Sequence, residues 1–346
     1  MRTEVGTMKT DRLSRRRAVG LMTLGGVAAS ALPPERRAHA QSLDKISYQT
    51  NWRAQAEHGG FYQALATGLY KGVGLDVEIR QGGPQLDVNA VLLAGRADVV
   101  ESDAFRTFNF ARDNVPGVAI TAVFQKDLRA LLSHPGVGND TLAALKGKPI
   151  LIGAAGRTSF WLWLKAKYGY SDEQIRPYTF NFAPFLADKN TSMQAFITSE
   201  PYAIRQAGVD PVIHLLADNG FVNYSDILVC LPKTVTERKD VVQRFVDASV
   251  KGWKSYLTGD PTPANALIKG ANPDMTDDKI AYAIKVMREA NIVGGGDAAT
   301  LGIGALNADR WNGFYKDMVD CGALPGGWDV AKLMTTEFVN KKVATI

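Results

Sequence analysis

An aromatic and an amide side chain that can recognise a flat ligand come just after a strand-like run near residue 50. Asn51 and Trp52 follow the segment 45–49, which has strand character. An indole at a strand end offers a rigid face on which a ring can stack, and the neighbouring amide can donate or accept a hydrogen bond. Trp52 could instead be a core residue at the end of a strand. The pair is therefore a candidate wall of a ligand site.

A second polar group follows the short strand-like run 98–101. Ser102 and Asp103 come directly after it, and a helical segment begins at Ala104. A carboxylate in this place can accept hydrogen bonds from an amino group or a protonated ring nitrogen of a ligand. It can equally cap the helix that follows.

Two glycine-containing segments lead into helices and could receive a ligand at a helix N-terminus. They contribute the candidate residues His58 and Gly59, and further along Gly156, Arg157, Thr158 and Ser159. Glycine allows a ligand to approach backbone N–H groups, and an arginine can pair with a carboxylate, sulfonate or phosphate. Either segment could also be a capped, solvated loop. The second one lacks the G-x-x-x-x-G-K-[ST] pattern of a P-loop.

Glu200 and Tyr202 follow the strand-like run 194–198. A carboxylate at this strand end could face Asp103 and suit a ligand with donor groups, and the tyrosine could add a hydroxyl. The alternative is an ordinary turn before a helix.

The elements that must position these residues alternate between short strands and helices. Strand-like runs lie at 45–49, 75–79, 98–101, 118–124, 149–153, 178–182, 194–198, 212–215 and 227–231. Helical segments lie between most of them, among these 58–71 and 104–112. Repeated βαβ units predict α/β sheets that are mostly parallel and flanked by helices. The pattern restarts after residue 140, and helices dominate after residue 240. The sequence therefore predicts a two-lobed α/β fold.

The predicted lobes comprise residues 44–128 plus 227–346, with the C-terminal helices, and residues 129–226. Hinge crossings near 126–132 and 223–227 would join them. Ligands of open parallel sheets bind beyond the carboxyl ends of the strands, so the ligand is expected in the cleft between the lobes. Closure around it would be a hinge motion.

Residues 1–40 have the three parts of an export signal. A basic segment with Arg15-Arg16-Arg17 precedes a mildly apolar stretch, and Ala38-His39-Ala40 is a small-residue cleavage motif. The paired arginines indicate the twin-arginine (Tat) route, with cleavage after Ala40 into the periplasm. These residues hold the whole net charge of +5. The remainder is neutral, which argues against a nucleic-acid partner.

Catalytic and metal-binding patterns are missing from the sequence. Cys230 and Cys321 form no Cys/His cluster, and whether they are bridged cannot be read from their spacing. There is no G-x-S-x-G or H-E-x-x-H motif. We therefore expect no cofactor, no metal and no enzymatic activity.

Four stretches carry a resemblance to a known family. They are Thr50-Asn51-Trp52 with 58–64, then 68–77, then 92–99, and finally 145–150 with Ser199-Glu200-Pro201-Tyr202. They resemble the SsuA/THI5-like (NMT1-like) substrate-binding proteins of ABC importers for nitrate, sulfonates and thiamine precursors. This resemblance implies a type II-like periplasmic-binding-protein fold. It also implies capture of a solute and transient delivery, as a monomer, to an ABC permease in the inner membrane.

The resemblance also implies a class of ligand. In pyrimidine-binding members an Asn/Asp-Trp pair follows the first strand, and its Trp stacks on the ring. Asn51-Trp52 matches that pair. We therefore predict transport of a small heteroaromatic compound similar to a thiamine pyrimidine precursor. Alternatives are an alkanesulfonate, nitrate or carboxylate anion, or an enzyme similar to the pyrimidine synthases. Those synthases have a cysteine-rich motif that this chain lacks.

Overall fold

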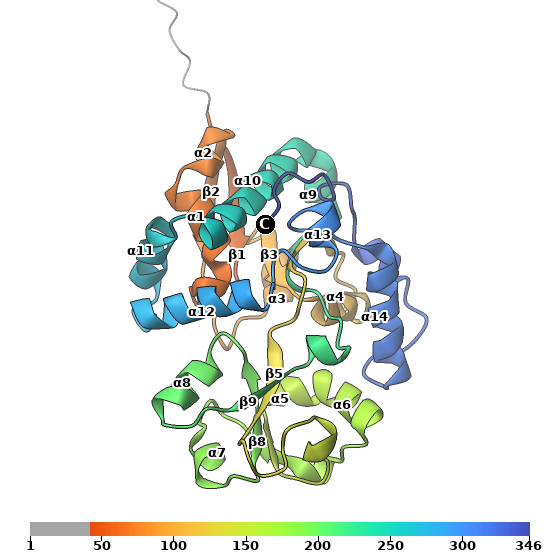
Figure 1. Cartoon of the computed structure of the whole chain (residues 1–346). Coiled ribbons are helices and arrows are strands. Elements are labelled where there is room, and N and C mark those ends of the chain that lie inside the picture. Colours follow the sequence, from red (N-terminus) through yellow and green to blue (C-terminus); the bar gives the residue numbers. More distant parts are fainter. Residues whose placement is uncertain (1–41) are drawn as a thin grey trace, which may run out of the picture. The chain divides into compact units, whose positions relative to one another are not determined.

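Residues 42–346 are described by the computed structural model, and they contain two five-stranded sheets (Figure 1). The strand order is β2-β1-β3-β10-β4 in the first sheet and β7-β6-β8-β5-β9 in the second. We call the first sheet with its helices lobe 1 and the second with its helices lobe 2. The predicted export signal, residues 1–40, lies outside the described residues. Within 42–346, no helix has both the length and the apolar composition needed to cross a membrane.

Lobe 1 holds both ends of the described chain. Its strands are β1 (Asp44–Gln49), β2 (Leu75–Arg80), β3 (Val99–Ser102), β4 (Val118–Phe124) and β10 (Ser225–Cys230). Its first helices are α1 (Gly59–Ala66), α2 (Leu69–Gly72), α3 (Val88–Leu93) and α4 (Ala104–Arg112). The C-terminal part adds α9 (Pro232–Glu237), α10 (Lys239–Thr258), α11 (Thr262–Ala271), α12 (Asp277–Glu289), α13 (Ala298–Leu301) and α14 (Ala308–Asp320).

Lobe 2 is smaller and its helices are short. Its strands are β5 (Arg129–Ser133), β6 (Ile150–Ile152), β7 (Ile175–Pro177), β8 (Ser192–Phe196) and β9 (Val212–Leu215). Its helices are α5 (Ala154–Arg157), α6 (Phe160–Tyr168), α7 (Ala183–Ala187) and α8 (Glu200–Gln206).

The two-lobed α/β architecture predicted from the sequence is confirmed, and each sheet is mostly parallel, with four strands in one direction and a single strand against them. In lobe 1, β1 pairs in parallel with β2 and β3, whereas β10 is antiparallel to β3 and β4. In lobe 2, β6 is parallel to β7 and β8, whereas β5 is antiparallel to β8 and β9. The reason lies in the crossings. β5 and β10 each carry the chain into a lobe from the crossing, so they run against the strands that end there.

Residues 125–128 and 216–224 connect the two sheets. We propose that the lobe boundaries lie in these two segments. The crossing expected at 126–132 includes most of β5, and the one expected at 223–227 includes the start of β10. Each crossing continues directly into an apolar strand, so sequence patterns place the boundary between crossing and strand imprecisely.

Two local predictions were wrong. The helix expected from 58 to 71 is divided, because Gly68 adopts a left-handed backbone (φ 76°) between α1 and α2. The strand expected at 178–182 is absent. Strand β7 ends at Pro177, and Phe180 also has a left-handed backbone, with φ 63°. A non-glycine residue in that region interrupts an extended chain.

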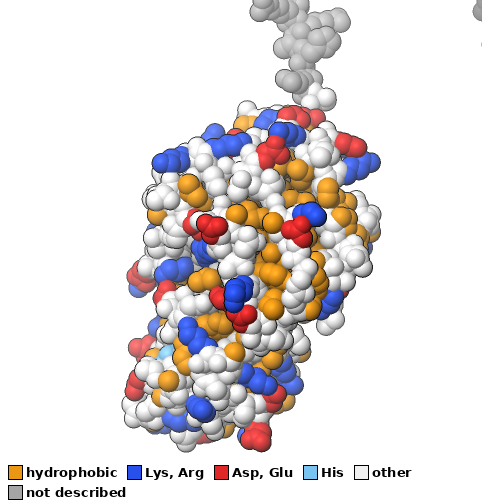
Figure 2. Space-filling model, turned by 90° about the vertical axis from the view of Figure 1, so that its right-hand side faces the viewer, with side chains coloured by type: hydrophobic (Ala, Val, Ile, Leu, Met, Phe, Trp, Pro, Cys, Tyr) orange, Lys and Arg blue, Asp and Glu red, His pale blue; other side chains and the backbone are white. Residues whose placement is uncertain are grey.

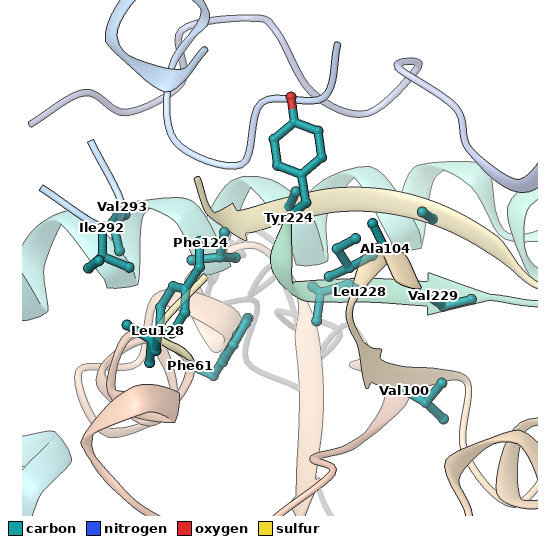
Figure 3. Close-up of a cluster of buried hydrophobic side chains, with 14 of the residues drawn as sticks. Phe61, Val100, Ala104, Phe124, Leu128, Tyr224, Leu228, Val229, Ile292 and Val293 are labelled. Atoms are coloured by element: carbon teal, nitrogen blue, oxygen red, sulfur yellow. The ribbon is translucent and has the colours of Figure 1, made fainter. Parts of the chain in front are cut away.

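The core of lobe 1 includes the cluster of buried hydrophobic side chains drawn in Figure 3, to which α1 contributes Phe61. Its helices α1 and α10 lie in close contact. A Cβ on Gly252 of α10 would lie 2.2 Å from the backbone oxygen of Gly60 in α1. A Cβ on Gly60 would lie 2.1 Å from the ring of Trp253. Glycine at both positions lets the two helices approach to backbone contact, and the buried ring of Phe61 packs edge-on against Trp253, with centroids 5.8 Å apart.

The surface carries side chains of both charges, and the two cysteines are not joined by a disulfide. Acidic and basic side chains are interspersed over the face drawn in Figure 2. Cys230 is buried in β10 and Cys321 is partly buried after α14, and neither is in a disulfide. Burial raises the pKa of the Cys230 thiol, as expected for an inert core cysteine.

Candidate functional site

A cavity of about 1190 Å³ lies between the strand ends of the two lobes. Lobe 1 contributes the loop after β1 and the start of α4. Lobe 2 contributes the loop after β6, the loop after β7 and Gln194 of β8. Seven of the twelve candidate residues from the sequence line the cavity, namely Asn51, Trp52, Asp103, Gly156, Arg157, Thr158 and Ser159. That these residues touch a ligand stays a prediction.

The wall formed by Asn51 and Trp52 is held by hydrogen bonds from behind. The backbone N–H and the side-chain amide of Asn51 both donate to Glu101, at 3.0 Å each. The Trp52 carbonyl accepts a hydrogen bond from Thr50 Oγ1 at 2.6 Å. The indole of Trp52 therefore projects from a loop whose backbone is anchored on neighbouring strands.

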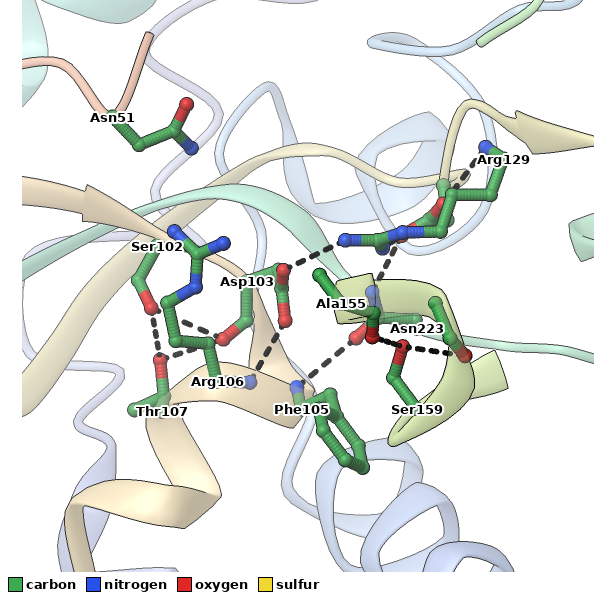
Figure 4. A network of polar contacts seen from close by, with 12 residues as sticks. Asn51, Ser102, Asp103, Phe105, Arg106, Thr107, Arg129, Ala155, Ser159 and Asn223 are labelled. Carbon is green, nitrogen blue, oxygen red and sulfur yellow. Dashed lines mark hydrogen bonds and ion pairs between the residues drawn. The ribbon is translucent and has the colours of Figure 1, made fainter. Parts of the chain in front are cut away.

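Asp103 has the capping role that the sequence left open. Its Oδ1 accepts a hydrogen bond from Arg106 N at 2.8 Å, at the N-terminus of α4 (Figure 4). Its Oδ2 lies 3.1 Å from the guanidinium of Arg129, at the start of β5. Burial raises the pKa of this carboxyl, but the charges of Arg129 and Arg106 outweigh burial and leave the pKa below its usual value. Asp103 is thus ionised, and both of its oxygens have protein partners.

Arg129, in lobe 2, belongs to a group of paired side chains that includes residues of lobe 1 and of both crossings. Besides Asp103 of lobe 1, its guanidinium pairs with Asp127, which lies in the first crossing and is fully buried. Asn223, in the second crossing, donates to Asp127 and accepts from Phe105 N at 3.2 Å. Burial raises the pKa of Asp127 against the opposing effect of Arg129. We call Asp103, Asp127, Arg129 and Asn223 the crossing cluster.

The segment 153–159 of lobe 2 lines the cavity, but its hydroxyls act differently from the sequence expectation. Ser159 Oγ donates to the Ala155 carbonyl at 2.8 Å, and Thr158 Oγ1 does so at 3.4 Å. Neither hydroxyl caps a helix N-terminus. The N–H of Gly153 donates to Gln194 Oε1 at 2.7 Å. Arg157 is exposed and has no ion pair within residues 42–346.

Five predicted site residues do not line the cavity. His58 and Ser102 are buried behind the wall, where His58 Nε2 lies 3.1 Å from Glu101 and Ser102 Oγ accepts from Thr107. Gly59 packs against Tyr256, since a Cβ there would lie 2.0 Å from the tyrosine ring. These three residues neighbour cavity-lining segments in the sequence, but the side chains of His58 and Ser102 and the Cα of Gly59 are packed in the core.

Glu200 and Tyr202 lie outside the cavity for another reason. Glu200 accepts hydrogen bonds from Phe196 N at 2.8 Å and from the Tyr178 hydroxyl at 3.3 Å. Tyr178 lines the cavity, so Glu200 supports a wall residue from behind. Burial raises the pKa of Glu200. Tyr202 instead packs against Tyr282 of α12, with ring centroids 5.4 Å apart.

The sequence reasoning missed many cavity residues, among them Phe105, Arg106, Arg129, Tyr178, Phe180 and Gln194. Arg106 sits one turn into the helix after β3, and the strand-end rule extended by one turn would have included it. Phe180 carried no such signal, because 178–182 looked like strand.

The cavity has a surplus of positive charge that no carboxylate within residues 42–346 neutralises. Its three carboxylates all accept bonds from the chain: Asp87 caps α3, Asp103 caps α4, and Asp113 pairs with Arg112. Arg129 is paired as well. Within the described residues, Arg106 and Arg157 line the same cavity and have no ion-pair partner. One arginine comes from each lobe.

Comparisons with known proteins place the chain among proteins of this architecture. A family model described as "NMT1/THI5 like" matches residues 55–264. A curated relative from Aspergillus parasiticus, named 4-amino-5-hydroxymethyl-2-methylpyrimidine phosphate synthase, is 29% identical over 111 residues. That match covers 32% of this chain and 32% of the relative. The chain thus spans about a third of the length of the curated relatives it matches.

Two solved structures extend the likeness over most of the chain. The periplasmic aliphatic sulphonate binding protein SsuA from Escherichia coli has a TM-score of 0.62 at 13% identity, over 85% of this chain and 92% of that one. The alkanesulfonate-binding protein SsuA from Xanthomonas axonopodis pv. citri, solved bound to MOPS, has a TM-score of 0.60 at 13% identity, over 85% and 98%. At such identity the likeness concerns the fold, which is that of periplasmic binding proteins. Together with the match over residues 55–264, it shows that this chain belongs to the NMT1/THI5-like family.

Proposed function

We propose that this chain is the solute-binding component of an ABC uptake system and that it binds a small flat organic anion. The observation that carries the proposal is the cavity between the two sets of strand ends. Trp52 lines it together with Arg106 and Arg157, which have no ion-pair partner among the residues that the structure describes. An aromatic face and a guanidinium together suit a ring that bears a carboxylate, sulfonate or phosphate.

The charge of the ligand follows from which protein groups remain available. An amino-bearing heterocycle was expected to use Asp103 and Glu200 as acceptors. Asp103 already accepts from Arg106 N and pairs with Arg129, and Glu200 does not line the cavity. The guanidinium groups of Arg106 and Arg157 form no ion pair within residues 42–346, so their N–H groups are available to a ligand. The proposal therefore keeps the heteroaromatic ring and adds an anionic group to it.

The names of the relatives support both halves of this ligand. The Aspergillus parasiticus relative is named for a pyrimidine phosphate, and the Xanthomonas SsuA was solved with MOPS. The proposal also includes Tat-dependent export with cleavage after Ala40. In the periplasm the chain would act as a monomer and deliver its solute to an inner-membrane permease.

The synthase names of the curated relatives favour a second candidate, an enzyme of pyrimidine formation. A receptor and an enzyme differ in what happens to the bound compound. A receptor releases the ligand unchanged after denaturation, whereas an enzyme that consumes it releases a product. Mass spectrometry of the released compound separates the two.

The test is a thermal-shift screen of the purified protein with small anions. The panel is 4-amino-5-hydroxymethyl-2-methylpyrimidine phosphate, benzenesulfonate, methanesulfonate and nitrate. A ligand at about 100 times its Kd should stabilise the protein by about 2.7 kcal/mol. We expect the two ring-bearing anions to raise the melting temperature more than the two small ones.

Arginine variants assign the effect to the cavity. Arg106→Ala and Arg157→Ala should each weaken binding of the ring-bearing anion by about tenfold or more, because a charge-assisted hydrogen bond is lost. Arg53→Ala is the matched control. Arg53 is next to Trp52 but is exposed, pairs with Asp274 at 3.3 Å and does not line the cavity. If no organic anion changes the melting temperature, the proposal is wrong.

A further inference from the structure

Phe180 is exposed in a way that the packing of lobe 2 does not explain. It is the most exposed of the large hydrophobic residues, with 67% of its surface accessible, whereas its neighbour Tyr178 is at 7%. Its backbone is left-handed, with φ 63°. For a bulky residue this conformation costs about 1 to 2 kcal/mol, and such strain collects at functional sites. The chain thus holds an aromatic ring in solvent at a cost in stability.

Tyr178 and Asn181, one before and one after Phe180, both make hydrogen bonds within lobe 2 that hold this loop. Tyr178 donates its hydroxyl to Glu200 at 3.3 Å. Asn181 accepts a hydrogen bond from Ala183 N at 2.9 Å, where α7 begins. Because both sides are held by lobe 2, the Phe180 ring is presented at a fixed place on the cavity wall.

The Phe180 ring lies opposite Trp52, which belongs to lobe 1. Their ring centroids are 6.0 Å apart and their planes are inclined by 39°. Carbon atoms in contact are about 3.5 to 4 Å apart, so a planar ring stacked on both faces needs about 7 to 8 Å. An opening of about 1 to 2 Å and a rotation of the two rings toward parallel would therefore admit one flat ring. A saturated ring is thicker and lacks a π face.

We propose that Trp52 and Phe180 form an aromatic clamp between the lobes and that Phe180 is a specificity-determining residue, which selects planar rings. This inference rests on the proposed function of solute binding. The clamp stacks one face of the ligand ring on each lobe. The ligand then bridges the lobes, and a planar ring is what holds them together.

The test compares two probes with the same anionic group, benzenesulfonate and cyclohexanesulfonate, by isothermal titration calorimetry. The wild-type protein should bind the planar probe at least about fivefold more tightly, as expected for stacking on two aromatic faces. Phe180→Leu keeps an apolar side chain but removes the ring, so it should lower this ratio to about twofold. Phe196→Leu is the control, since Phe196 is an exposed aromatic residue of lobe 2 outside the cavity.

A second variant separates the clamp from a structural role. Phe180→Gly removes the ring and also the strain of the left-handed backbone, because glycine adopts this conformation freely. We expect its melting temperature to be equal to or above that of wild type, while the preference for the planar probe is lost. A preference that survives in both Phe180 variants overturns the clamp and leaves solute binding intact. If neither probe binds the wild-type protein, the ring-anion function fails and the clamp fails with it.

Discussion

The two lobes present very different surfaces to the same cavity. On lobe 1 the polar wall residues Asn51 and Asp103 are already hydrogen-bonded from behind, on Glu101 and at the start of α4. Arg106 is the exception, since it has no ion-pair partner within residues 42–346. On lobe 2 two wall residues are exposed, namely Phe180, which has a strained backbone, and Arg157, which has no ion pair in the described part of the chain. Lobe 1 thus contributes a largely preformed wall, whereas lobe 2 carries exposed side chains that are available to contact a ligand.

The difference follows from what lies behind each wall. Lobe 1 is supported by the 20-residue helix α10 and the C-terminal helices, and α1 and α10 are in backbone contact at glycines. In lobe 2 the cavity segment ends in α5, which has only 4 residues. Stabilising a wall through a long, closely packed helix reduces its freedom to adjust. The three following predictions test this contrast.

The largest effect is expected at the crossing cluster, where the two lobes meet. Arg129→Met leaves Asp127 without its cation and Asp103 with only the charge of Arg106, and losing one partner of a buried pair costs about 3 to 5 kcal/mol. The pKa of Asp127, already raised by burial, would rise further, and the pKa of Asp103 would rise with it. The loss should therefore be small near pH 4 and grow as the pH rises, because the folded variant holds these protons up to a higher pH than the folded wild type does.

Urea unfolding between pH 4 and pH 8 measures this dependence. Arg112→Met is the control, since Arg112 pairs with Asp113 at the surface with side-chain exposures of 61% and 36%. Its stability should change by less than about 1 kcal/mol at any pH. Equal losses in the two variants would show that the crossing cluster does not join the lobes energetically.

The next effect compares one glycine from each lobe. In Gly252→Ala the new methyl group would meet the backbone oxygen of Gly60 at 2.2 Å, and backbone cannot move aside cheaply. We expect a loss of about 3 kcal/mol in the free energy of unfolding. In Gly156→Ala the nearest atoms, at 2.8 and 2.9 Å, belong to the side chains of Phe160 and Gln194, which can shift.

Gly156→Ala should therefore cost less than about 1 kcal/mol, since alanine also favours the helix. Thermal and chemical unfolding of both variants give the comparison. A loss in Gly156→Ala as large as that in Gly252→Ala would contradict the view that lobe 2 is the adaptable side.

The smallest effect is expected for a buried carboxyl group of lobe 1 that lacks a hydrogen-bond partner in the described chain. Asp226, in β10, is buried, and neither of its carboxylate oxygens has a hydrogen-bond partner in the described chain. Burial, with Glu101 and Glu57 nearby, raises its pKa well above the usual 3.8. The folded state therefore holds this proton more tightly than the unfolded state. The contribution of Asp226 to stability is greatest below about pH 4 and falls as the pH rises.

Asp226→Asn removes the ionisation and tolerates the left-handed backbone of this position, where φ is 47°. At pH 7 we expect the variant to be more stable than wild type by about 1 to 2 kcal/mol, with little difference at pH 4. Unfolding curves at both pH values decide the matter. A variant that is less stable at pH 7 would indicate that the carboxylate has a partner, such as a buried water.

Much of the fold was predictable from local patterns. The period-two run at 75–79 and the helix from Ala104 to Arg112 were placed within one residue, because alternation and capping are local signals. The single antiparallel strand of each sheet was not predictable in this way. It depends on β5 and β10 entering their lobes from the crossings, which no local pattern records.

The site was predictable to the extent that strand ends converge. Trp52 and Arg157 were assigned from their places after β1 and β6, and both line the cavity. His58 and Glu200 follow the same rule in sequence, yet they support the wall from behind. The rule identifies the loop but not which way each side chain of the loop points.

The amino-acid sequence by itself determined the order of strands and helices, the two-lobed architecture and the family resemblance. These depend on periodicity, composition and short motifs, all of which are written along the chain. Only the tertiary structure decided that Asp103 is engaged by Arg129 and that Phe180 meets Trp52 across the cavity. Asp103 and Arg129 are separated by 26 positions in the sequence, and Trp52 and Phe180 by 128 positions. Such contacts exist only once both lobes have folded.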